Sequence, residues 1–169
     1  MHKTTTPQQR PRRRPVIEAF TDGGCLGNPG PGGWAFHLTL APGRVLEDSG
    51  AAAATTNNRM ELIAVIQALR AARDLPEAAS AEVVVFTDST YVQQGITSWI
   101  RRWRANGWLT AAKQPVKNAK LWRVLDQVAS DTGAQFRWVR GHAGDPRNER
   151  CHALVQAAIA ADRDHAGRG

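Results

Sequence analysis

The segment Glu82–Thr87 reads Glu-Val-Val-Val-Phe-Thr, and it constrains the fold of this 169-residue chain more than any other segment. A near-continuous run of β-branched residues is typical of a central strand that is buried on both faces. A strand of this kind has to be covered on each side by other elements, and helices are the usual cover. The length of the chain suits one domain with a substantial core.

Strand and helix patterns alternate on both sides of this run. Short apolar or alternating segments predict four further strands, at residues 16–20, 34–40, 44–49 and 136–139. Apolar residues at helical spacing predict helices at residues 57–73, 90–94, 96–105, 118–130 and 147–160, with a break near Gly95. The glycine-rich residues 23–33 are expected to form a tight connection. A meander of strands followed by crossovers predicts an α/β fold, with one mixed sheet and helices on its faces.

The ends of the chain differ in composition from its middle. Residues 1–15 are rich in Pro and Arg and predict a disordered basic arm, which is followed by one domain at 16–162 and a short flexible tail at 163–169. The chain has no apolar run of membrane-spanning length and no secretory signal, so we expect no membrane association. Cys25 and Cys151 form no disulfide framework and lack zinc-site spacing, which favours a cytoplasmic protein. We expect it to be a monomer.

The net charge of +7 is unevenly distributed. Residues 1–14 and 96–120 hold eleven Lys and Arg and no acid, so the rest of the chain is mildly acidic. In the second block Trp99, Trp103 and Trp108 interleave with the basic residues, and tryptophan is seldom exposed without a use. This block therefore predicts a nucleic-acid-binding surface, with a merely solvated helix face as the alternative. For the first block a solubilising tail is the favoured interpretation.

Three acidic residues lie at positions suited to a divalent-metal site. Asp22 and Asp88 each follow an apolar strand, and Glu61 lies near the start of the helix at 57–73. Hard cations such as Mg²⁺ prefer carboxylate oxygens. The structural alternatives are an Asx-turn for each Asp and, for Glu61, a capping arrangement with Asn58 as the N-cap.

Five segments of the chain, spread from its first strand to the loop before its last helix, resemble bacterial type 1 ribonuclease H. They are residues 20–33 (FTDGGCLGNPGPGG), 55–62 (TTNNRMEL), 87–89 (TDS), 95–100 (GITSWI) and 141–144 (GHAG). The resemblance implies a five-stranded mixed sheet, an antiparallel meander plus parallel strands, flanked by helices. It also implies an endonuclease that hydrolyses the RNA strand of RNA·DNA hybrids by two-metal-ion catalysis and leaves 5′-phosphate products.

The resemblance also implies roles for individual residues. Asp22, Glu61 and Asp88 match the metal-binding carboxylates, and His142 matches a mobile loop histidine that carries a proton. His152 stands where the family has its fourth Asp, so it is a candidate catalytic and metal-binding residue. The residues expected to contact the hybrid are Cys25, Asn28, Thr56, Asn57, Asn58, Trp99, Arg101, Arg102, Trp103, Arg104, Lys113 and Lys117. The remaining tryptophans, Trp34, Trp122 and Trp138, are expected in the core.

His152 leaves two questions open. Imidazole is a poor ligand for Mg²⁺ and suits Mn²⁺ and later metals better, so we expect two ions of Mg²⁺ or Mn²⁺, with Mn²⁺ preferred. The ring is expected to lean inward, where it either ligates a metal or is only close to one. The alternative function is a catalytically impaired domain that binds RNA·DNA hybrids, and a weaker one is a general nucleic-acid-binding module with a vestigial metal site.

Overall fold

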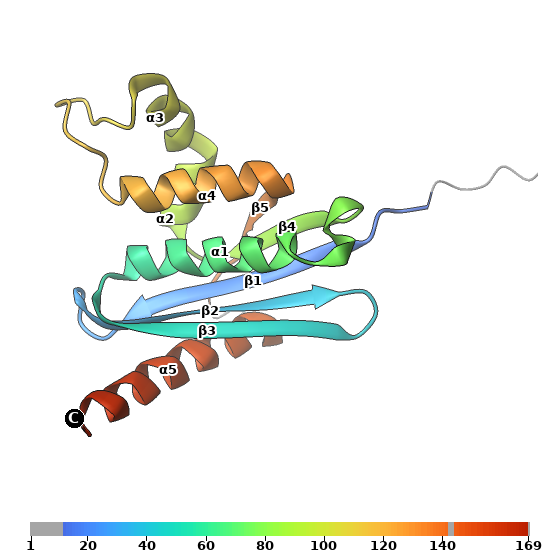
Figure 1. The fold of residues 1–169 in the computed structure, drawn as a ribbon, viewed down its shortest axis with the longest axis horizontal. Coiled ribbons are helices and arrows are strands. Elements are labelled where there is room, and N and C mark those ends of the chain that lie inside the picture. The colour runs from blue at the N-terminus through green and yellow to red at the C-terminus, as the bar shows by residue number, and fades with distance from the viewer. Residues whose placement is uncertain (1–11, 142–143, 169) are drawn as a thin grey trace, which may run out of the picture.

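The computed structural model describes residues 12–141 and 144–168, and its centre is a five-stranded sheet (Figure 1). The strands are β1 (Val16–Cys25), β2 (Gly30–Leu40), β3 (Arg44–Thr55), β4 (Glu82–Thr87) and β5 (Gln135–Trp138). Their order is β3-β2-β1-β4-β5, with antiparallel β1–β2 and β2–β3 pairs and parallel β1–β4 and β4–β5 pairs. The expected mixed sheet is confirmed. Most of the predicted arm, residues 1–11, lies outside the described residues.

Helices cover both faces of this sheet (Figure 1). They are α1 (Asn57–Arg73), the short η1 (Pro76–Ala79), α2 (Thr90–Gln94), the π-helical η2 (Gly95–Trp99), α3 (Ile100–Asn106), α4 (Ala119–Thr132) and α5 (Pro146–Ala166). α1 and α4 lie on one face, while α5 crosses β1, β2 and β3 on the other. Within the described residues, no helix combines the length and apolar character needed to cross a membrane.

Two apolar clusters hold these layers together. The larger lies between the sheet and the α1–α4 side, and Leu62, Leu69 and Trp122 are fully buried in it. The smaller lies under α5, where Val155 and Ile159 pack against Phe20 of β1. β1 therefore contributes side chains to both clusters, and this fixes its position in the middle of the sheet.

The first two strands are longer than expected. Cys25 pairs with Gly32 and Gly24 with Gly33, so the predicted connection at 23–33 is wrong except for residues 26–29. The backbone hydrogen bonds of an antiparallel pair continue through glycine because they need no side chain. As a consequence Asp22 lies inside β1 instead of at its end. β3 likewise continues to Thr55 rather than stopping at residue 49.

The predicted break near Gly95 is also wrong, because helix continues from α2 through η2 into α3. A Cβ on Gly95 would lie 2.0 Å from the Trp122 ring, so the glycine is required by packing and does not interrupt the helix. The expected boundary at residue 162 falls inside α5, which runs to Ala166. Trp122 is buried and Trp34 packs against the core as predicted, but Trp138 is 44% exposed on β5.

Candidate functional site

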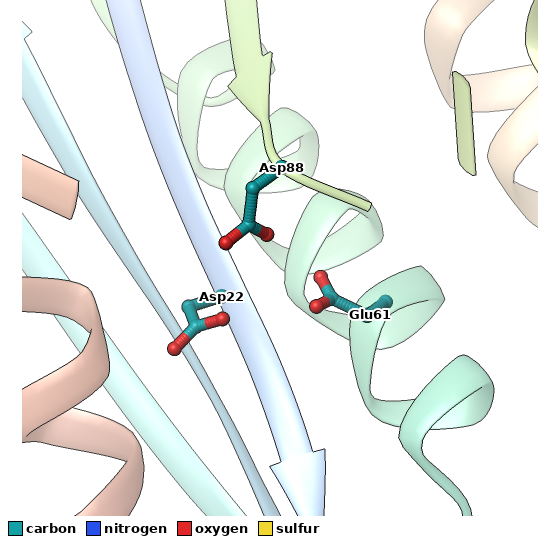
Figure 2. A group of neighbouring side chains, drawn as sticks. All are labelled: Asp22, Glu61 and Asp88. Atoms are coloured by element: carbon teal, nitrogen blue, oxygen red, sulfur yellow. The ribbon is translucent and has the colours of Figure 1, made fainter. Parts of the chain in front are cut away.

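Three carboxylates from separate segments meet at one place. Asp22 comes from β1, Glu61 from α1 and Asp88 from the residue after β4, and oxygen atoms of all three lie within 4.8 Å of one another. Figure 2 shows the three side chains directed toward a shared space. β1 and β4 are parallel neighbours paired as far as Phe20 and Phe86, so Asp22 and Asp88 each lie two residues beyond the same pair. The structure thus brings together the three acids that the sequence analysis singled out.

Glu61 reaches this place because α1 passes directly against β1. A Cβ on Gly23 would lie 2.4 Å from the Met60 carbonyl carbon and 2.5 Å from the Glu61 nitrogen, so only glycine permits this contact. The N-cap of α1 is Thr56, whose hydroxyl accepts a hydrogen bond from the Arg59 backbone N–H at 3.3 Å. Glu61 lies beyond the first turn, so the capping arrangement with Asn58 is wrong.

Burial and mutual repulsion govern the ionisation of these acids. Burial raises the pKa of Glu61 well above its ordinary value, and the nearby Asp22 and Asp88 raise it further. Burial also raises the pKa of Asp22, and the nearby Asp88 raises it further. A hydrogen bond from His152 acts in the opposite direction and lowers it. One oxygen of Glu61, Oε2, is buried and has no hydrogen-bond partner among the described residues. Close, poorly solvated carboxylates with a spare oxygen are the donor set that divalent cations take, so the residues fit such ions.

His152 lies at the solvent edge of this cluster. Its Nδ1 is 3.2 Å from Oδ2 of Asp22, and its side chain is 53% exposed where that of Asp22 is 13% exposed. The ring thus reaches toward the carboxylates without being enclosed by them. His142 lies outside the described residues.

A groove of about 590 Å³ begins at Asp22 and Asp88 and continues between α5 and the end of β1. Its α5 wall includes Asn148, His152 and Gln156, spaced four residues apart. Sequence reasoning singled out only His152 from this row. The i, i+4 spacing of polar side chains on one helix was the available signal for the other two.

Hydrogen-bonding residues predicted to touch the hybrid gather beside the groove. The Asn28 side-chain oxygen accepts from the Asn57 backbone N–H at 3.2 Å, and the Asn57 side-chain oxygen accepts from the Cys25 N–H at 2.9 Å. Thr56 caps the same helix, and Asn58 is exposed in its first turn. These five residues therefore form one polar surface at the N-terminus of α1.

The predicted basic surface forms a protrusion, defined here as α3 and the segment that follows it up to residue 118. Its basic residues are all exposed, and they are Arg101, Arg102, Arg104, Lys113 and Lys117. The Arg104 guanidinium is different, because it forms an ion pair with Asp126 of α4.

The tryptophans of this protrusion, and Trp99 just before it at the end of η2, are packed rather than exposed. The rings of Trp99 and Trp103 are 5.7 Å apart and lie against the buried Trp122, at 6.4 and 5.4 Å respectively. Both side chains are half-buried against the core. The protrusion is thus charged on its surface and aromatic underneath, and these two rings mainly support it.

Comparison with known proteins gives the same interpretation as the geometry. The RNase H family model matches residues 14–160. The chain belongs to the ribonuclease H family. A Ribonuclease H of Treponema pallidum subsp. pallidum is 52% identical over 155 residues, covering 85% of this chain and 90% of that protein. A Ribonuclease H of Brucella ovis is 50% identical over 143 residues, covering 85% and 89%. The resemblance to the bacterial type 1 enzymes is confirmed.

Solved structures show the same fold. LC9-RNase H1, described as a type 1 RNase H with the type 2 active-site motif, superposes with a TM-score of 0.77 at 33% identity. The alignment covers 90% of this chain and 75% of that one. LC11-RNase H1 in complex with an RNA/DNA hybrid gives a TM-score of 0.62 at 26% identity, over 86% of this chain and 98% of that one.

Proposed function

We propose that the protein hydrolyses the RNA strand of RNA·DNA hybrids by two-metal-ion catalysis at Asp22, Glu61 and Asp88, leaving 5′-phosphate products. As a member of the ribonuclease H family it is an endonuclease that acts on such hybrids. The observation that carries the metal-dependent mechanism is the convergence of the three carboxylates, one of them with a buried oxygen for which the described part of the chain offers no hydrogen-bond partner.

The family depends on divalent metal ions, and the three carboxylates are the proposed ligands. Two such ions, when bound, activate a water molecule and neutralise the departing 3′-oxygen. Asp22, Glu61 and Asp88 would hold these ions, and the resemblance to the family implies Asp22 as the ligand that both would share. His142 is proposed to carry a proton to the leaving oxygen, a role suited to a side chain that titrates near neutrality.

His152 is proposed as a metal ligand that favours Mn²⁺ over Mg²⁺. Neighbouring ligand atoms of an octahedral ion lie about 3 Å apart, and the 3.2 Å between His152 and Asp22 is compatible with that spacing. Imidazole offers a neutral nitrogen where a fourth carboxylate would offer a charged oxygen. The site therefore carries less negative charge, which weakens its attraction for a second cation, and its ligand set suits Mn²⁺ better.

The hybrid is proposed to cross the polar surface at the start of α1 and to reach the protrusion. Amide and hydroxyl groups such as those of Asn28 and Asn57 suit the minor groove, where the 2′-hydroxyls distinguish RNA from DNA. The exposed Arg101, Arg102 and Lys113 suit the phosphates of the backbone. The protein is proposed to act as a monomer. Two free cysteines support a cytoplasmic location.

A cleavage assay tests this proposal. An end-labelled RNA·DNA hybrid should be cut inside its RNA strand in Mn²⁺ and less rapidly in Mg²⁺, and a DNA duplex of the same sequence should stay intact. His152→Asp should reduce the ratio of Mn²⁺ to Mg²⁺ activity, because it restores the fourth carboxylate.

His152→Ala separates ligation from mere proximity, since loss of a ligand should lower Mn²⁺ activity well below that of the parent. Equal Mn²⁺ activity in the two proteins would show that three carboxylates suffice. Hybrid binding in EDTA without cleavage in either metal would instead show the catalytically impaired domain.

A further inference from the structure

Trp138 occupies an unusual position for an indole. It is the last residue of β5, at the edge of the sheet, and the residue is 44% exposed. Its Nε1–H nevertheless donates a hydrogen bond to the main-chain carbonyl of Asp88 at 3.2 Å. An exposed tryptophan loses favourable burial, so this contact with a catalytic segment calls for an explanation.

The contact extends the hydrogen bonding between β4 and β5 beyond the strands themselves. Thr87 pairs with Trp138 in the parallel register, and the Val139 N–H donates to the Thr87 carbonyl at 2.9 Å. Asp88 follows β4 but does not belong to α2, whose N-cap is Ser89. Its carbonyl lies between two regular elements, and the indole N–H reaches it from β5. A side chain thus supplies the donor one residue past the end of β4.

The segment after β5 also approaches Asp88 from its carboxylate side. A Cβ on Gly141 would lie 2.9 Å from Oδ2 of Asp88 and 3.6 Å from its Cγ. The backbone and the carboxylate of Asp88 are therefore both bounded by residues at the end of β5. A change at Trp138 should be felt by Asp88, because the indole N–H bonds directly to its main-chain carbonyl.

We propose that Trp138 is a positioning residue whose indole N–H holds the main chain at Asp88 so that the carboxylate faces Asp22 and Glu61. This inference rests on the proposed metal site. Residues that orient a metal ligand typically contribute about 10–100-fold to metal affinity or activity. Since the bond here goes to the ligand's main chain, we expect an effect near the lower end of that range.

Two substitutions separate the donor from the ring. Trp138→Phe keeps an aromatic ring and removes the N–H. Trp138→Gln removes the ring and keeps an N–H donor, separated from Cα by the same number of bonds as the indole nitrogen. Trp108→Phe is the matched control, because Trp108 packs against Trp103 in the protrusion, away from the carboxylates.

The experiment is a calorimetric titration of each full-length protein with Mn²⁺ in the absence of hybrid, together with thermal unfolding. We expect Mn²⁺ binding to weaken about 10-fold in Trp138→Phe, and to stay within about 3-fold of the parent in Trp138→Gln and Trp108→Phe. In cleavage assays with Mn²⁺, Trp138→Phe should lower kcat and leave KM for the hybrid unchanged, because the hybrid-binding surfaces are not altered.

Parent-like Mn²⁺ binding in Trp138→Phe, or equal losses in the Phe and Gln variants, would overturn the positioning role. If Trp138→Phe does not fold, Trp138→Gln is the deciding variant. Mn²⁺ binding within about 3-fold of the parent would support the role of the N–H donor, and a loss of about 10-fold or more would exclude it. Failure of the parent protein itself to bind Mn²⁺ would count against the proposed metal site. The two failures are therefore distinguishable.

Discussion

The acidic cluster and the basic protrusion are built in opposite ways. The cluster gathers Asp22, Glu61 and Asp88 from three elements into a poorly solvated space, and close packing at Gly23 fixes its geometry. The protrusion displays exposed side chains such as Arg101 and Lys113 on a base of tilted, closely packed aromatic rings. Chemistry on a phosphodiester needs ligands at set distances, whereas attraction of a polyanion needs mainly local charge. Substitutions in the cluster should therefore affect cleavage itself, whereas substitutions in the protrusion should affect hybrid binding.

The largest expected effect tests the cluster. Asp88→Asn removes a charged oxygen ligand and keeps the size of the side chain. We expect hybrid cleavage to fall by at least about 10³-fold, equivalent to about 4 kcal/mol of transition-state stabilisation. Asp48→Asn is the matched control, because Asp48 is exposed on β3. Activity of Asp88→Asn within about 10-fold of the parent in either metal would remove Asp88 from the site.

The second prediction concerns packing under the cluster. Gly23→Ala would place a methyl group 2.4 Å from the Met60 carbonyl carbon, so α1 must move away from β1. Overpacking of this kind costs about 1–3 kcal/mol of stability, and the displacement of Glu61 should also reduce cleavage. Gly24→Ala is the control, since its Cβ would meet only the Asn57 side-chain oxygen, at 3.8 Å. Urea unfolding should show a clear loss for the first variant, and equal midpoints would contradict the packing argument.

Sequence patterns predicted the parts of this molecule that depend on local periodicity. β4 and α1 follow from an apolar run and a helical stripe, and the position of Asp88 directly after β4 follows from the same apolar run. The extension of β1 and β2 into the glycine-rich residues 23–33 could not be predicted in this way. Glycine has little intrinsic strand preference, and these residues form strand because β1 and β2 pair with each other there.

Packing between residues that are far apart in the sequence could not be predicted from local patterns either. Gly95 is required by Trp122, which the sequence places far away, so the pattern wrongly predicted a helix break. Trp138 was wrongly predicted in the core because nothing in β5 itself reveals that it is an edge strand. Tertiary neighbours decided each of these cases.

The third prediction tests the protrusion. Replacing Arg101, Arg102 and Lys113 together with Ala should weaken hybrid binding at low salt and flatten the plot of log K against log salt by about 0.7–0.9 for each phosphate that is no longer neutralised. Arg104→Ala should change the slope less, because Arg104 already pairs with Asp126. Binding is measured in EDTA, so that cleavage does not interfere. An unchanged slope in the triple variant would show that these residues form a merely solvated face.

The smallest expected effect concerns the stability of the metal-free cluster. The pKa of Glu61 is raised in the folded protein, chiefly by burial, so the folded state binds more protons than the unfolded state above the ordinary value of 4.5. Stability from this group is therefore present at low pH and is lost as the pH rises through the folded pKa.

Glu61→Gln cannot ionise, so in EDTA at pH 7 it should melt higher than the parent by about 2–4 °C, the shift that roughly 1 kcal/mol produces in a domain of this size. The difference should shrink as the pH falls toward 4.5, and Mn²⁺ should reverse it at pH 7 because the ion binds the carboxylate form. Thermal unfolding at several pH values, with and without Mn²⁺, measures both effects. A Gln variant that melts at or below the parent in EDTA at pH 7 would show that Glu61 is not destabilised by its surroundings.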